Sequence, residues 1–198
     1  MSIAFDLGRT KHNPDSWIKS TIDITVNSLI YRKKILKEYH RKDFDVFELI
    51  TRELLGRNIW KYSEAYGKFK GCPFWSVEAL KLFESSKHKS LGKLANNLRH
   101  EHTYPQILLI NKLKSLEEIN YTIIEKLFKK FAVATVVTKQ ENDTLNSKDV
   151  GLRSSTISDE NIWLRYNNTK FKIKIAMNDN KNPFFEFHKK DMLKAKVI

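Results

Sequence analysis

The densest group of residues capable of chemistry is the run Arg99-His100-Glu101-His102, which Pro105 closes three residues later. An imidazole can bind a metal ion or transfer a proton near neutral pH, and a carboxylate can bind a divalent cation. A guanidinium matches the geometry of a phosphate. We therefore take Arg99, His100, Glu101 and His102 as the candidate catalytic residues. Glu101 and His102 are the candidate ligands of a divalent metal ion, the one cofactor that the sequence suggests.

The backbone of this run decides whether its side chains can work together. In an extended chain His100 and His102 point to one side and Glu101 to the other, whereas in a helix the two histidines lie about 200° apart. Pro105 disfavours helical geometry at the residue before it and suits the first turn of a new helix. We expect a helix that ends near Arg99, followed by extended backbone as far as Pro105. A purely structural connection between two helices, with the histidines bonded to loop carbonyls, is the alternative.

The segment Glu101-His102-Thr103-Tyr104-Pro105 resembles the acidic-His-x-x-Pro element that opens many HNH (ββα-metal) nucleases. The resemblance implies that Glu101 binds a divalent ion and that His102 activates water against a phosphodiester. The Asn and second His of that family would have to be Asn182 and His188, about 80 residues downstream, whereas Pro105 opens apolar helices here. We therefore limit the resemblance to these five residues and do not extend it to the fold.

Other sequence features exclude several classes of protein. The chain has a single cysteine, Cys72, so it has no internal disulfide framework and no cysteine-rich zinc site. It shows no Gly-rich phosphate loop, GxSxG elbow or HExxH motif. No apolar run approaches the roughly 18 residues that span a bilayer, and the start lacks the features of a secretory signal. We expect a cytoplasmic protein with no membrane partner.

The charge of the chain indicates the class of its partner. Lys and Arg number 36 against 23 Asp and Glu, a net charge of +13. Residues 61–100 hold eight basic and three acidic residues, and residues 151–198 hold ten and five, so each segment carries +5. Such an excess attracts a polyanion, and we expect DNA or RNA. An acidic protein partner, or a lysine-rich composition without functional meaning, are the alternatives. The candidate nucleic-acid contacts are basic residues of these clusters and strands: Arg32, Lys33, Lys34, Lys68, Lys70, Arg153, Arg165, Lys170, Lys172, Lys174 and His188.

Apolar periodicity predicts an α+β fold that is predominantly helical, with a small sheet formed by the C-terminal third. We expect residues 1–131 to be a mainly helical, basic region, with a helix stop at Gly56. Residues 132–198 are expected to form a strand-containing basic part packed on it within one domain. Strands are predicted at residues 132–137, 170–175 and 184–188, and a helical segment at 158–166.

These observations favour a nucleic-acid-binding protein that cleaves phosphodiester bonds, in a defence, restriction or toxin-like context. His100 and His102 would act as base and ligand, Glu101 as ligand or orienting group, and Arg99 as the phosphate clamp. Arg153, Arg165 and His188 are the expected distant contributors. The alternative is a protein that binds DNA, RNA or an acidic protein surface without catalysis.

Overall fold

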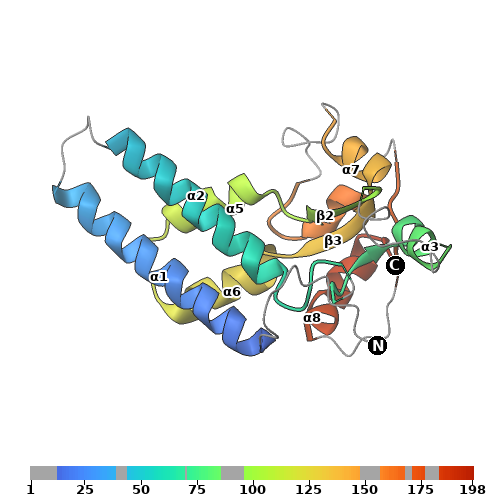
Figure 1. The fold of residues 1–198 in the computed structure, drawn as a ribbon, viewed down its shortest axis with the longest axis horizontal. Coiled ribbons are helices and arrows are strands. Elements are labelled where there is room, and N and C mark those ends of the chain that lie inside the picture. Colours follow the sequence, from blue (N-terminus) through green and yellow to red (C-terminus); the bar gives the residue numbers. More distant parts are fainter. Residues whose placement is uncertain are drawn as a thin grey trace.

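The computed structural model describes residues 13–38, 44–69, 71–85, 96–147, 157–167, 171–176 and 183–198. Within them the expected α+β, predominantly helical class is confirmed (Figure 1). The helices are α1 (Pro14–Glu38), α2 (Phe44–Ser63), α3 (Val77–Ser85), α5 (Gln106–Lys114), α6 (Tyr121–Phe131), α7 (Lys139–Leu145) and α8 (Pro183–Lys194), with a 3-10 helix η1 at Ile162–Tyr166. None of these described helices is long and apolar enough to cross a lipid bilayer.

The two longest helices, α1 and α2, lie side by side as a hairpin that extends from the rest of the molecule (Figure 1). They share a buried seam, in which the Asn58 amide donates to the Thr25 hydroxyl at 3.1 Å. The predicted helix stop at Gly56 is wrong, because α2 continues to Ser63. The Gln106 side chain of α5 donates to the Gly56 carbonyl at 2.6 Å, so this glycine lies where another helix approaches closely.

The described strands form one four-stranded sheet in the order β2-β3-β1-β4. Their bounds are β1 (Trp75–Ser76), β2 (Leu98–His102), β3 (Ala134–Thr138) and β4 (Ile175–Ala176). β3 pairs in parallel with β1 and antiparallel with β2, and β4 runs antiparallel to β1. The sheet is therefore not confined to the C-terminal third, since β1 and β2 come from earlier in the chain. Strands from both sides of residue 131 pair directly with one another.

Two predictions for the C-terminal part are corrected by the structure. The segment predicted as a strand at residues 184–188 lies in α8, because Phe185, His188 and Met192 follow helical spacing and are all buried. The segment predicted as helical at 158–166 is helical only over η1. The alternation at Lys172–Ile175 is confirmed, with the two lysines exposed and the two isoleucines buried, although the paired strand β4 begins only at Ile175.

The sheet separates two apolar clusters. The larger cluster joins the α1–α2 hairpin, α5 and α6 to one face of the sheet, and Trp163 and Phe128 are fully buried in it. A smaller cluster on the other face includes Cys72, Leu98 and Val136. Because side chains alternate along β2, its residues point in turn toward these two environments. This alternation sets the arrangement of the candidate site.

Candidate functional site

The run from Arg99 to His102 lies in β2, paired antiparallel with β3 so that His100 faces Val136 and Glu101 faces Thr135. The extended backbone expected from Arg99 onward is confirmed. The helix expected up to Arg99 is wrong at its end, because Leu98 and Arg99 already pair with β3. Backbone pairing to a buried neighbouring strand has overridden the local helical pattern there. As alternation requires, His100 and His102 share one face of β2 and Glu101 lies on the other.

His100 and His102 pack against the indole of Trp60, near the C-terminal end of α2. The ring centroid of Trp60 lies 5.3 Å from that of His100 and 5.0 Å from that of His102. The two imidazoles are 6.4 Å apart. His100 is 5 % exposed, and neither of its ring nitrogens has a hydrogen-bond partner; the buried Nε2 of His102 has none either. Buried polar atoms are nearly always paired, so three unpaired ring nitrogens on two neighbouring side chains are unusual.

The electrostatic surroundings keep both histidines neutral. Burial, with smaller contributions from His102 and Lys68, lowers the pKa of His100 to about 3. Burial and the charge of Arg165 lower the pKa of His102 to about 4. The ammonium of Lys68 lies 5.6 Å from the Trp60 ring centroid, on the same side of the sheet as the histidines. Neutral imidazoles retain a lone pair, which is the form that binds a metal ion or accepts a proton.

Glu101 belongs to a different environment, the larger buried cluster. Its Oε1 accepts from the Arg165 guanidinium at 2.6 Å, and its Oε2 accepts from the Tyr166 hydroxyl at 2.9 Å. Arg165 also donates to the backbone carbonyls of His102 and Leu145, at 3.1 and 2.9 Å. Burial raises the pKa of Glu101, and Arg165 and Tyr166 oppose that rise. Both carboxylate oxygens of Glu101 therefore accept hydrogen bonds from η1, and these bonds link η1 to β2.

The structure therefore divides the four predicted catalytic residues. His100 and His102 lie together, but Glu101 and His102 point to opposite faces of β2 and are not brought to one point. Arg99 turns back on the chain, and its guanidinium donates to the carbonyls of Asn96 and Leu98 at 3.0 and 2.8 Å. Within the described part of the chain, no three His, Cys, Asp or Glu side chains are grouped so that they could hold a metal ion.

The predicted nucleic-acid contacts are distributed over the molecule. Arg32 pairs with Glu48 at 2.5 Å, and Lys33 donates to the carbonyl of Glu117, so both make internal contacts. Arg165 and His188 are buried. The His188 ring lies 3.0 Å from the Lys129 carbonyl and accepts from the Trp163 indole at 3.4 Å. The exposed ones are Lys34, Lys68, Lys172 and Lys174. Lys70, Arg153, Lys170 and Asn182 lie outside the described residues.

The sequence did not identify two residues that contact the candidate site on β2, Trp60 and Tyr166. Trp60 stands in a segment rich in aromatic residues and lysines, which indicates either a core helix or a stacking surface but does not link it to His100. Tyr166 follows the apolar pattern of an inward-facing residue, and nothing in its spacing predicts that it donates to Glu101. Comparison with known protein families, with curated proteins and with solved structures finds no match to this chain.

Proposed function

We propose that this protein binds nucleic acid through a basic surface where the end of α6 meets α8. We call it the α6/α8 lysine surface and define it as Lys129, Lys130, Phe187, Lys190 and Lys194. Phe187 is 46 % exposed, and the Lys129 ammonium lies 4.9 Å from its ring centroid. Phe187, Lys190 and Lys194 follow at i, i+3 and i+7, so they share one face of α8. This juxtaposition of an exposed aromatic ring with lysines from two helices carries the proposal.

The chemistry of the surface suits a phosphate backbone. Lysine ammonium groups release counterions when they contact phosphates, which makes binding weaken steeply with salt. An exposed aromatic ring offers a face on which an unpaired base can stack. The carboxylates of α8, Glu186 and Asp191, are fewer than its lysines, so the surface keeps a positive balance. The net charge of +13 supports the same partner at longer range.

Reversing three charges on this surface should weaken binding and its salt dependence. We expect the triple variant Lys129→Glu, Lys190→Glu, Lys194→Glu to bind a fluorescein-labelled oligonucleotide at least about tenfold more weakly, with a salt slope reduced by about 2–3. Fluorescence anisotropy over a salt series, with single-stranded DNA, single-stranded RNA and duplex DNA, measures both quantities. The same titrations show which nucleic acid is preferred.

The control is a second triple variant with the same change in net charge. Lys34→Glu, Lys37→Glu, Lys139→Glu reverses three exposed lysines, two near the C-terminal end of α1 and one on α7. It should retain most of the affinity. Equal weakening by both triple variants would mean that net charge alone causes binding, and absence of binding at low salt would refute the proposal.

Cleavage of phosphodiester bonds at His100 and His102 is a second candidate function. One observation favours it: three buried ring nitrogens of this pair have no hydrogen-bond partner, which leaves them available to a metal ion or a water. Glu101 is given no role as a ligand in this candidate, because Arg165 and Tyr166 occupy its oxygens. The site would have to open beside Trp60, since the indole contacts both imidazoles.

A cleavage assay decides this second candidate. If it holds, the wild-type chain should degrade labelled DNA or RNA with Mg²⁺, Mn²⁺ or Zn²⁺, and His102→Ala should abolish cleavage while leaving affinity within about twofold, because the α6/α8 lysine surface is untouched. Gel analysis of the products, beside anisotropy on the same samples, separates the two effects. Intact substrate with all three metal ions would rule out this function without affecting the binding proposal.

A further inference from the structure

The outer side of α2 presents a row of apolar side chains to solvent. We call these residues the α2 apolar band: Val46, Leu49, Ile50 and Leu54, which are 63, 56, 59 and 38 % exposed. Their spacing places them on one side of the helix, opposite the seam that packs on α1. Large apolar side chains exposed singly are ordinary, but four on adjoining turns of one helix indicate an interaction surface.

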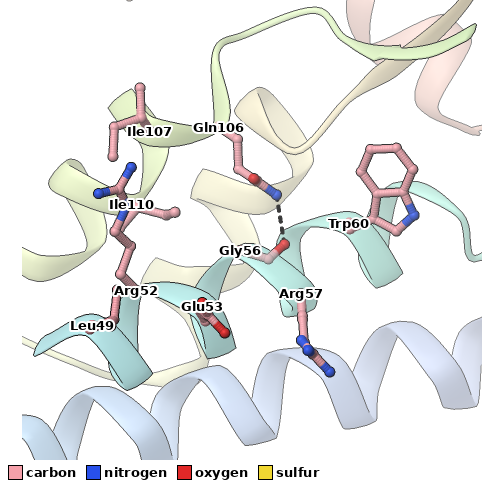
Figure 2. A pocket seen from close by; sticks show the side chains of 9 residues that line it. All are labelled: Leu49, Arg52, Glu53, Gly56, Arg57, Trp60, Gln106, Ile107 and Ile110. Carbon is pink, nitrogen blue, oxygen red and sulfur yellow. Dashed lines mark hydrogen bonds between the residues drawn. The ribbon is translucent and has the colours of Figure 1, made fainter. Parts of the chain in front are cut away.

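The band continues on both sides into neighbouring helices. On the α1 side, Tyr31 is 56 % exposed and its ring lies 6.1 Å from that of Phe47. On the α5 side, a groove of about 490 Å³ runs between α2 and α5, with Leu49, Ile107, Ile110 and Trp60 among its lining residues. Figure 2 shows this groove, with Leu49 and Trp60 toward its two ends. The exposed apolar surface therefore extends from α2 toward both α1 and α5.

Equal numbers of acidic and basic side chains lie on the band and along its α5 side. Asp45 lies at the N-terminal end of α2 and Arg57 toward the C-terminal end, with Arg52 and Glu53 between them, and all four are exposed. Two carboxylates and two guanidinium groups give no net attraction for a strongly acidic or a strongly basic partner. They do fit a partner that carries the same pattern in the opposite direction.

We infer that the α2 apolar band binds the same band of a second copy of this chain, with the two α2 helices antiparallel about a two-fold axis near Ile50. Asp45 lies five residues before Ile50 and Arg57 seven after it, so this arrangement sets the acidic start of each helix beside the basic end of the other. Opposed helix dipoles favour the same direction. A two-fold contact uses one surface patch twice and closes, as in most soluble homo-oligomers. This inference does not depend on the proposed nucleic-acid binding.

The oligomeric state of the full chain tests the inference. Sedimentation equilibrium should give twice the chain mass of 23.3 kDa at micromolar concentration. Ile50→Glu should raise the dissociation constant of the dimer by about tenfold or more, because it places a charge at the centre of an apolar contact. Leu193→Glu is the matched control, since Leu193 is 56 % exposed on α8 and should leave the dimer intact. Both positions are exposed, so both variants should keep the wild-type circular dichroism spectrum. A chain that remains monomeric, or a dimer unaffected by Ile50→Glu, would overturn the inference.

A charge exchange tests the antiparallel direction. Asp45→Arg alone and Arg57→Asp alone should each weaken the dimer, because each places like charges opposite one another. The double variant restores opposite charges across the axis and should recover most of the wild-type dissociation constant. Two single effects that simply add in the double variant would contradict the antiparallel pairing of Asp45 with Arg57.

Discussion

Replacing Glu101 with Gln is expected to lower the free energy of unfolding by about 3–5 kcal/mol, the usual cost of removing one partner of a buried ion pair. Glu101 is 8 % exposed and Arg165 is 3 % exposed. The substitution would leave the Arg165 charge in the core with carbonyl acceptors but without a carboxylate. Stabilities of single domains lie at about 5–15 kcal/mol, so a loss of this size is a large fraction of the whole.

Urea unfolding followed by circular dichroism measures this loss. The exposed ion pair of Glu78 with Lys81 on α3 is the control, because both side chains are more than half exposed. We expect Glu78→Gln to change the stability by less than about 1 kcal/mol, as for surface pairs in general. Similar effects of Glu101→Gln and Glu78→Gln would show that the buried pair does not hold η1 against β2.

A double variant keeps the prediction testable if Glu101→Gln fails to fold. Glu101→Leu combined with Arg165→Met removes both charges and fills the space with apolar side chains, a change that is often neutral or stabilising for buried pairs. Tyr166 would lose its acceptor, but its hydroxyl lies near the Thr103 and Thr135 side chains, whose oxygens can accept in place of the carboxylate. We expect the double variant to be more stable than Arg165→Met alone, because the single variant leaves the buried Glu101 carboxylate without its cationic partner.

The alternation of β2 could be predicted from the sequence, because it depends only on the period of an extended chain. Once residues 99–102 are extended, His100 and His102 must share a face and Glu101 must oppose them. The partners on each face could not be predicted. Trp60 and Arg165 are about 40 and 60 residues distant in sequence, and only the tertiary packing that places these two side chains against opposite sides of β2 brings them to the strand.

Local signals identified helix starts well and the ends of elements poorly. Thr138 and Glu141 have the spacing of a capping box, and the structure contains it, because both hydrogen bonds involve neighbours in sequence. The strand predicted at 184–188 is helical because burial of Phe185, His188 and Met192 against η1 and the core decides that segment. Gly56 lies inside α2 for a related reason, since tertiary contacts with α5 outweigh the helix-breaking tendency of one glycine.

Acidification is expected to destabilise the fold steeply below about pH 6.5, the pKa of histidine in an unfolded chain. Burial lowers the folded-state pKa to about 3 for His100 and to about 4 for His102 and His188. The unfolded state therefore takes up protons that the folded state cannot, and stability present above pH 6.5 is lost as the pH falls toward these values. Three such histidines give about 4 kcal/mol per pH unit within the window, and about 5–6 kcal/mol between pH 7 and pH 5.

Urea unfolding at a series of pH values tests this expectation, and two histidine variants assign the effect. His100→Leu removes one titrating group together with two unpaired ring nitrogens, so the slope should fall by about a third while stability at neutral pH is retained or increased. His188→Leu should also reduce the slope, but it should cost stability at neutral pH, because the Trp163 indole and the Lys129 carbonyl lose their partner. A loss of stability on His100→Leu as large as on His188→Leu would contradict this expectation. It would show that the ring nitrogens of His100 have a partner in solution, such as an ion or a water molecule bound beside Trp60.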